Sequence, residues 1–341
     1  AYDENGDYAR SAMIKMRDDW GINFPENPLV IANELDISEK SSRHNLNVNF
    51  TYEILKDLKF SARLGQQWYN YRYFYYRPMS IGRDGAPAYS SALSAYNVGR
   101  TTSVYDVDKL GEFTLNYQKD FGKSRINALA GYTMQKKTYD RVGVEAKGFA
   151  NDRIHEVTAH GTNASDISLY STRKAAWSLL SYFARLNWSY DGRYALTGTV
   201  RADGSSRFGV DNRYGFFPSV SAGWTLSNEP FLKDKLEDVA SIRLRASWGK
   251  SGNNNIGNYS SIASISTGGY AFGNTAVSAT AEGAFTDTAL GWETTTQTNI
   301  GVDLGFLDNR INVIANYYNS ISSDILYKAP ISVISGSTST T

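Results

Sequence analysis

The sequence predicts an all-β fold of about ten antiparallel strands. Three observations support this prediction: apolar and polar residues alternate along many segments, the composition favours strands and turns, and short connections alternate with long ones. Tyrosine occurs 24 times and glycine 29 times, and aromatic residues make up 13% of the 341 residues. Helical periodicity is almost absent, and its best example is a short segment around residues 230–239. The mixture therefore favours strands joined by turns.

Alternation is clearest in "RHNLNVNFTYEI", where every second residue is apolar. One face carries Leu46, Val48, Phe50, Tyr52 and Ile54, and the other carries Asn45, Asn47, Asn49, Thr51 and Glu53. Because successive side chains of a strand point to opposite faces, this pattern predicts one apolar and one polar face. The same pattern recurs at 182–190, 242–248 and 300–306. Further strands are expected at 58–70, 111–119, 125–135, 193–201, 215–227 and 310–319.

Connections between these segments differ in length from one end of the predicted sheet to the other. The turns "ILKDLKF", "KDFGKS", "YDGRY" and "FLDNRI" are short, whereas residues 71–110, 136–177 and 250–291 form long connections. The tight turns predict that Tyr190 lies opposite Tyr194 and that Phe306 lies opposite Ile311. Short turns at one end and long loops at the other are typical of bacterial outer-membrane barrels.

Aromatic and charged residues fit a barrel whose apolar face meets lipid and whose polar face meets the lumen. Arg185, Arg243 and Arg245 all fall on the polar face, where they avoid the roughly 2–4 kcal/mol that a lipid-facing arginine costs at the bilayer midplane. Two interfacial girdles are predicted, one from Trp188, Tyr190 and Tyr194 and the other from Trp248 and Trp292. The predicted fold is therefore a segment of an antiparallel transmembrane β-barrel.

Catalytic and cofactor chemistry finds no support in the sequence. The chain has no cysteine, only 3 histidines and a net charge of +1, so thiol chemistry and a nucleic-acid partner are both disfavoured. "GKS" at 249–251 lacks the earlier glycine of a phosphate-binding loop, and His155 and His160 in "HEVTAH" are not spaced as zinc ligands on one helix face. We expect no enzyme, no catalytic residue, no cofactor and no metal site.

Three clusters are candidates for substrate binding, because aromatic rings stack on sugars while arginine and amide groups bind hydroxyls. "YNYRYFYYRP" contributes Tyr71, Arg72, Tyr73 and Tyr75. "RADGSSRFG" contributes Arg201, Asp203 and Arg207, and "GNNNIGN" contributes Asn253, Asn254 and Asn255. Each cluster also has a structural interpretation: an interfacial girdle for the first, an ion-pair and turn network for the second, and local turn hydrogen bonds for the third.

Four motifs in sequence order carry a resemblance to a known family. They are "RADGSSRFG", "NRYGFFPSVSAGWTLSNEPFLK", "IRLRASWGKSGNNNIGNYS" and "LGWETTTQTNIGVDLGFLDNRINVIANYYN". These motifs resemble the SusC/RagA family of TonB-linked outer-membrane transporters from Bacteroidetes-type bacteria, most densely over residues 178–328. The resemblance implies a barrel of about 22 strands around a plug domain. We therefore expect this chain to be the middle of a larger transporter, with residues 1–42 as an extracellular connecting region and residues 43–341 as the barrel segment, without the plug.

The resemblance also implies a function and partners. Such a transporter imports a nutrient, most often an oligosaccharide and sometimes a peptide. A SusD-like lipoprotein covers its extracellular mouth, TonB–ExbB–ExbD drives it through the plug, and lipid surrounds it in the outer membrane. Two alternatives stay open from the residues alone: a soluble β-rich carbohydrate-binding module and a β-sandwich or propeller enzyme, because a sandwich strand also has one apolar and one polar face.

Overall fold

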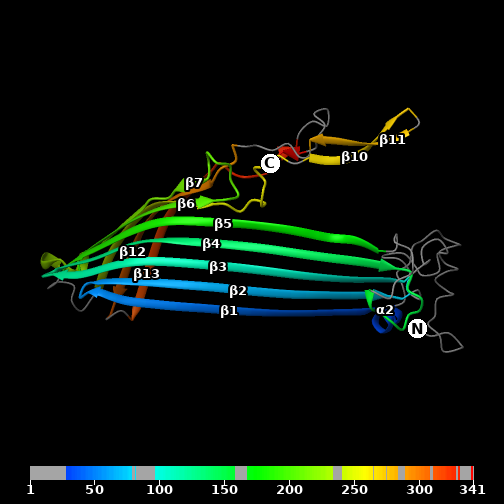
Figure 1. The fold of residues 1–341 in the computed structure, drawn as a ribbon. Coiled ribbons are helices and arrows are strands. Elements are labelled where there is room, and N and C mark those ends of the chain that lie inside the picture. Colours follow the sequence, from blue (N-terminus) through cyan, green and yellow to red (C-terminus); the bar gives the residue numbers. More distant parts are fainter. Residues whose placement is uncertain are drawn as a thin grey trace, which may run out of the picture. The chain divides into compact units, whose positions relative to one another are not determined.

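The computed structural model describes residues 28–78, 81, 97–157, 167–232, 240–263, 265–273, 275–282, 289–307, 310–327, 329–330 and 339–340. Most of these residues belong to one antiparallel sheet of 11 strands, whose long first strands β1 to β5 are labelled in Figure 1. Ten of the strands follow the order β1-β2-β3-β4-β5-β6-β8-β9-β12-β13, and β7 pairs with β6 beside this path. Neighbours in the sheet follow one another along the chain, which confirms the predicted meander of about ten strands.

The strands of this sheet differ in length along the chain. The first five are the longest: β1 (Asp36–Leu55), β2 (Leu58–Arg77), β3 (Val98–Phe121), β4 (Ser124–Lys147) and β5 (Ile167–Tyr190). The others are β6 (Tyr194–Ser205), β7 (Tyr214–Phe216), β8 (Ser219–Thr225), β9 (Ala240–Asn253), β12 (Glu293–Phe306) and β13 (Ile311–Ser323).

A few short elements lie outside the main sheet. Two separate hairpins are formed by β10 (Ile265–Phe272) with β11 (Thr275–Glu282) and by β14 (Ala329–Pro330) with β15 (Ser339–Thr340). Among the described residues, helical structure occurs chiefly in α2 (Pro28–Glu34), in the 3-10 turn η3 (Leu226–Asn228) and in a turn that begins at Pro230. The remainder of the predicted 230–239 helix lies outside the described residues. Among the described helices, none has the length and apolar content needed to cross a bilayer.

The long connections are shorter than the sequence suggested, because strands extend into them. β2 continues to Arg77, β3 starts at Val98, β4 continues to Lys147 and β5 starts at Ile167. The predictions that 71–110 and 136–177 were loops throughout were therefore wrong. The reason is physical: a strand that continues beyond the apolar layer no longer needs apolar residues on its outer face, so the alternation that marks a strand disappears while the ladder hydrogen bonds remain.

Both pairings predicted from the turns are confirmed. Tyr190 lies opposite Tyr194 and Phe306 lies opposite Ile311. Between the tyrosines, Asp191 and Gly192 adopt left-handed backbone angles (φ 49° and 65°), which aspartate and glycine tolerate better than most residues. These pairings fix which side chains share a face from β5 to β13.

The chain divides into two compact units. Unit 1 contains residues 1–45, 67–108 and 138–175, and unit 2 contains residues 46–66, 109–137 and 176–341. Unit 1 has a small core in which the fully buried Tyr76 ring packs edge-on against Phe149 and stacks on His155 at 4.0 Å. Asn97, also fully buried, fixes the same segment by accepting a hydrogen bond from the Phe149 N–H at 2.6 Å.

Unit 2 carries the predicted apolar face. No other described element covers this face. Leu46 is 53% exposed and Leu186 is 52% exposed, as are many apolar side chains of the same face. A second sheet or a helix layer over this face would have buried them, as in a sandwich. The described residues thus leave this apolar face uncovered, as the barrel prediction requires.

The girdle near the short turns is confirmed, and the second girdle is corrected. Trp188 stacks with Tyr190, and Tyr190 stacks with Tyr194. Trp248 is 42% exposed on the apolar face, but Trp292 packs instead against Phe208 and Phe217, each at 5.2 Å between ring centroids. The prediction for Trp292 was wrong because its indole N–H needs a partner, and it donates to the Arg213 carbonyl at 3.0 Å inside this aromatic cluster.

Candidate functional site

The polar face of unit 2 forms a continuous wall of hydrogen-bonding side chains. One row crosses eight strands, because cross-strand pairing brings small polar residues opposite one another. The row consists of Gln118, Asn127, Asn187, Thr197, Ser221, Ser247, Asn299 and Tyr318. Within it, Asn187 Oδ1 accepts a hydrogen bond from the Thr197 hydroxyl at 2.9 Å, and Asn187 Nδ2 donates to Asn127 Oδ1 at 3.4 Å.

The predicted arginines lie on this polar face. Arg245 binds both carboxylate oxygens of Asp303, with Nε and Nη2 at 2.8 and 2.7 Å, and it also donates to Asn316 Oδ1 at 3.1 Å. Gly301 makes room for this guanidinium, since a β-carbon there would lie 3.1 Å from Arg245 Nη2. Arg185 lies opposite Thr199 and Arg243 lies opposite Asp303, on the same face. The polar face therefore offers charged and amide groups to the lumen.

The tyrosines of "YNYRYFYYRP" form a row on the polar face of β2 in unit 1. The rings of Tyr69 and Tyr71 are 6.5 Å apart and nearly parallel, as are those of Tyr73 and Tyr75. Their face is fixed by Gly65, whose β-carbon position lies 3.1 Å from Asn47 Oδ1 on the polar face of β1. Because side chains alternate along a strand, every second residue after Gly65 shares its face.

Two arginines frame this tyrosine row. The Arg43 guanidinium lies 5.2 Å from the Tyr69 ring centre, and Arg100 lies 5.2 Å from the Tyr75 ring centre. Arg100 is held by an ion pair of 2.7 Å with Glu145. Tyr75 is buried, while Tyr69, Tyr71 and Tyr73 are partly exposed.

Arg72 lies on the other face of β2, away from the tyrosine row. It is exposed and lines a cavity of about 610 Å³ together with Lys40 and Phe74, to which Tyr73 also contributes. The sequence placed Arg72 with Tyr71 and Tyr73 because the residues are adjacent. The alternation of the strand separates them.

The charged residues of "RADGSSRFG" bind one another and a neighbouring loop. Arg201 Nε lies 2.7 and 2.8 Å from the two carboxylate oxygens of Asp203, and Arg201 Nη2 donates to the Ser181 hydroxyl at 2.9 Å. Asp203 is buried. Arg201 and Asp203 thus neutralise each other. This pairing favours the structural interpretation of the cluster, an ion-pair network, over direct contact with a substrate.

Arg207 joins this stretch to "GNNNIGN" across about fifty residues of sequence. Its guanidinium donates to the Asn254 carbonyl and to Asn258 Oδ1, both at 3.0 Å, and lies 5.0 Å from the Trp177 ring centre. Asn254 Nδ2 donates to Ser205 Oγ at 3.1 Å. Burial against these groups lowers the pKa of Arg207 below its usual range.

Asn253 and Asn255 form a local turn beside this network. The Asn255 N–H donates to Asn253 Oδ1 at 2.9 Å, and both side chains are exposed. Sequence reasoning missed Trp177, Ser205 and Asn258, because nothing in their local sequence indicates a partner so far along the chain.

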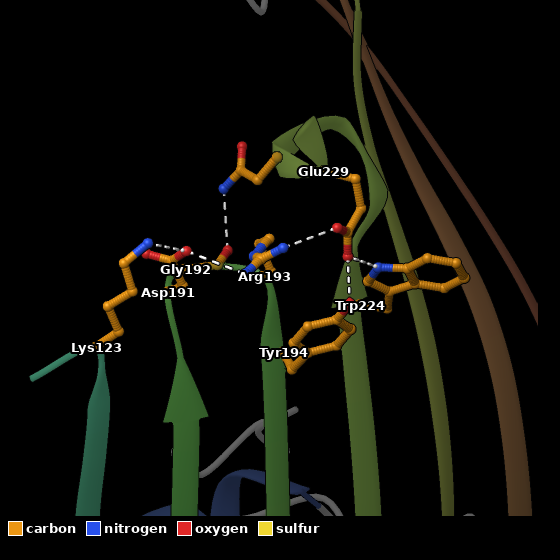
Figure 2. Close-up of polar contacts among 8 residues, drawn as sticks. Lys123, Asp191, Gly192, Arg193, Tyr194, Trp224 and Glu229 are labelled. Atoms are coloured by element: carbon orange, nitrogen blue, oxygen red, sulfur yellow. Dashed lines mark hydrogen bonds and ion pairs between the residues drawn. The ribbon is translucent and has the colours of Figure 1, made fainter. Parts of the chain in front are cut away.

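A second charged network fixes the short-turn end of unit 2 (Figure 2). Glu229 is 4% exposed and accepts hydrogen bonds from Arg193 Nη1 at 3.0 Å, from the Tyr194 hydroxyl at 2.5 Å and from Trp224 Nε1 at 2.9 Å. Asp191 pairs with Lys123 at 2.9 Å and with Arg193 at 3.1 Å. We call these residues, together with Asn228, the turn network. Its members come from three consecutive short-turn connections of the sheet.

Comparison with known proteins identifies this architecture. A family model described as "TonB dependent receptor-like, beta-barrel" matches residues 3–341. The chain belongs to the TonB-dependent receptor β-barrel family. As a family member it is an outer-membrane β-barrel protein, which excludes the soluble carbohydrate-binding module and the β-sandwich or propeller enzyme.

Individual family members agree with the SusC/RagA resemblance. The TonB-dependent receptor SusC of Bacteroides thetaiotaomicron is 31% identical over 320 residues, and the TonB-dependent receptor P3 of Formosa agariphila is 30% identical over 312 residues. Each alignment covers 91% of this chain and 30% of the relative. The structure of the RagAB peptide transporter matches with a TM-score of 0.80 and 27% identity, covering 91% of this chain and 33% of that one. The chain thus spans about a third of the length of these TonB-dependent receptors.

Proposed function

We propose that this chain forms part of the wall of a TonB-driven importer that carries an oligosaccharide across the outer membrane. The observation that carries the proposal is the tyrosine row on the polar face of β2, with Tyr71 and Tyr73 partly exposed and Arg43 at its end. Flat aromatic rings pair well with the C–H faces of sugar rings, while neighbouring arginine and hydroxyl groups satisfy sugar hydroxyls. The row performs no covalent chemistry and acts as a binding surface.

The wall of unit 2 supports the same role. Its row of small amide and hydroxyl side chains offers many weak, similar hydrogen-bonding groups, and the strongest charges are paired with each other, as in Arg245 with Asp303. A surface of this kind lets a polar, uncharged molecule pass without holding it tightly. Oligosaccharides have this chemistry.

Partners follow from the family. We propose that a SusD-like lipoprotein closes the extracellular side and that TonB–ExbB–ExbD supplies energy through a plug domain of the whole protein. The domain division at residues 42 and 43 also stays a prediction, as do the binding roles of Arg201, Asp203, Arg207 and Asn253–Asn255.

The experiment compares uptake by cells that carry Tyr71→Ala and Tyr73→Ala in the intact transporter. A matched control is Tyr105→Ala, which removes an exposed tyrosine from the outward face of β3. We expect labelled oligosaccharides to enter wild-type and control cells and to enter the double variant about thirtyfold more slowly, because each of the two lost stacking contacts costs about 1 kcal/mol. A protonophore should stop all uptake.

A second experiment with peptides tests the substrate class independently of the transport mechanism. Labelled peptides are offered to the same cells, because the RagAB structure is that of a peptide transporter. Uptake of peptides together with exclusion of every oligosaccharide would overturn the oligosaccharide proposal while leaving TonB-driven import intact. Uptake that persists with the protonophore would overturn the transport mechanism itself.

A further inference from the structure

Three cations line one cavity on the outward, apolar face of unit 2. The cavity has a volume of about 570 Å³, and its lining includes Lys109 of β3, Lys136 of β4 and Arg213, which precedes β7. Leu64, Met134 and Leu180 supply an apolar floor. Among the described residues that line it, none is an aspartate or a glutamate.

Strand pairing brings the two lysines opposite one another. Phe113 stacks on Tyr132 at 5.0 Å, and a β-carbon on Gly111 would lie 3.3 Å from Met134 Cγ. Two residues further along each strand, the same pairing places Lys109 opposite Lys136. Like charges directly opposite each other destabilise a sheet, so an arrangement of this kind calls for a counter-charge.

The described part of the chain does not provide that counter-charge. The side chains of Lys109, Lys136 and Arg213 form no ion pair or hydrogen bond with any described residue, and all three residues are exposed. Lys119, another outward lysine on β3 in unit 2, does have a counter-charge, because its Nζ lies 3.5 Å from Asp57 Oδ2. An anion from outside the protein therefore fits the cavity.

The position of the cavity along the membrane normal indicates the source of this anion. A barrel strand crosses the hydrocarbon layer with roughly 9–11 residues. Counted from Phe121 beside the short turn, about 11 residues of β3 end at Gly111, and about 11 residues of β4 counted from Ser124 end at Met134. Lys109 and Lys136 lie two residues beyond these positions. The cations thus lie at the headgroup level of the leaflet farthest from the short turns, which is the outer leaflet.

We propose that this cavity binds a phosphorylated glycolipid of the outer leaflet, with lipid A as its anionic core. Lys109, Lys136 and Arg213 contact the phosphate oxygens, and Leu64, Met134 and Leu180 contact an acyl chain. Charge-assisted hydrogen bonds between phosphate and lysine or arginine are among the stronger polar contacts in proteins. The lipid neutralises the lysine pair and fixes the barrel in its leaflet.

The test uses the full-length protein extracted in mild detergent and titrated with lipid A. Bound lipid is counted by native mass spectrometry for wild type, for the double variant Lys109→Gln/Lys136→Gln and for the control Lys137→Gln, which removes one positive charge from the opposite face of β4. We expect the double variant to bind lipid A about tenfold more weakly, because two charge-assisted contacts are lost. The control should bind like wild type. Equal binding by wild type and double variant would overturn the proposal.

Two further measurements keep the result interpretable. Heat-modifiable gel mobility reports whether each variant is folded, and Arg213→Gln tests the site from outside the strands, where a folding defect is not expected. Inorganic phosphate is offered as the competing probe. If it displaces lipid A at equal concentration, the cavity recognises a free anion, and the lipid proposal fails.

Discussion

Arg193 and Glu229 lie 36 residues apart in sequence and meet at 3.0 Å at the short-turn end of the sheet (Figure 2). Glu229 also accepts hydrogen bonds from the Tyr194 hydroxyl and the Trp224 indole N–H. Beside it, Asn228 Nδ2 donates to the Gly192 carbonyl at 3.0 Å. One nearly buried carboxylate thus ties the connection between β8 and β9 to the turn between β5 and β6.

Replacing Glu229 with glutamine is expected to loosen this connection. Glutamine keeps the shape but loses the negative charge, so Arg193 keeps only Asp191 as a counter-charge and the Tyr194 and Trp224 contacts weaken. We expect amide hydrogen exchange in residues 226–232 to become about fivefold faster. Glu293→Gln, at the other end of the sheet, serves as the control. Unchanged exchange in the Glu229 variant would show that the turn network does not hold the connection.

The same network predicts a dependence on pH. The Tyr194 hydroxyl, then the Trp224 indole and the Arg193 guanidinium, stabilise the Glu229 carboxylate and hold its pKa below the usual range. The pKa of Asp191 is lowered in the same way, mainly by its hydrogen bond from Lys123. A carboxyl with a depressed folded pKa stabilises the fold fully above its unfolded pKa of about 4, and this contribution is lost as the pH falls through the folded value. The protection factors of the amides in residues 226–232, which remove the intrinsic pH dependence of hydrogen exchange, should therefore be constant from neutral pH to about pH 5 and fall below about pH 4. A fall already at pH 6 would contradict this assignment.

Facing of the strands can be tested with neighbouring residues on β5. Leu186→Arg places a charge on the apolar face and is expected to destabilise the inserted barrel by about 2–4 kcal/mol. Asn187→Arg places the same charge on the polar face and should be tolerated. A control at Asp303, beside Leu304 on β12, would be unsuitable because Asp303 binds Arg245. If the two variants show equal heat-modifiable gel mobility, the assignment of the apolar and polar faces of β5 is wrong.

Gly252 allows Phe217 to pack against the backbone of β9. A β-carbon on Gly252 would lie 2.1 Å from Phe217 Cζ, whereas one on Gly198 would meet no atom within 4 Å. Gly252→Ala should displace the ring from its contact with Trp292 and cost about 1–3 kcal/mol in unfolding experiments. Gly198→Ala should be nearly neutral. A neutral Gly252→Ala variant would mean that the aromatic cluster adapts without strain.

Arg207 is expected to be irreplaceable even by lysine. Lysine keeps the charge but cannot reach Asn254 and Asn258 with two planar donors while lying over Trp177. Arg207→Lys should make residues 254–261 about tenfold more sensitive to limited proteolysis. Arg213→Lys, whose side chain has no partner among the described residues, provides the control. Proteolysis at the wild-type rate in both variants would show that the charge alone fixes the loop.

Much of the barrel could be predicted because it depends on local periodicity. The apolar series from Leu46 to Ile54 indicated a strand and its lipid-facing side, and the turn "YDGRY" indicated the Tyr190–Tyr194 pair that the structure confirms. The candidate binding residues were less predictable. Sequence proximity grouped Arg72 with Tyr71 and Tyr73, but the strand places Arg72 on the opposite face.

The sequence by itself determined the class of fold, the two faces of each strand and the family, because period-two alternation and turn composition are local properties that the chain carries wherever it folds. Only the tertiary structure decided that strands continue past the apolar layer, that Glu229 receives three donors and that Lys109 lies opposite Lys136. These features depend on which strand lies beside which and in what register. Local patterns indicate only the pairs beside a tight turn, because the energy of a long-range contact appears only when the distant segments meet.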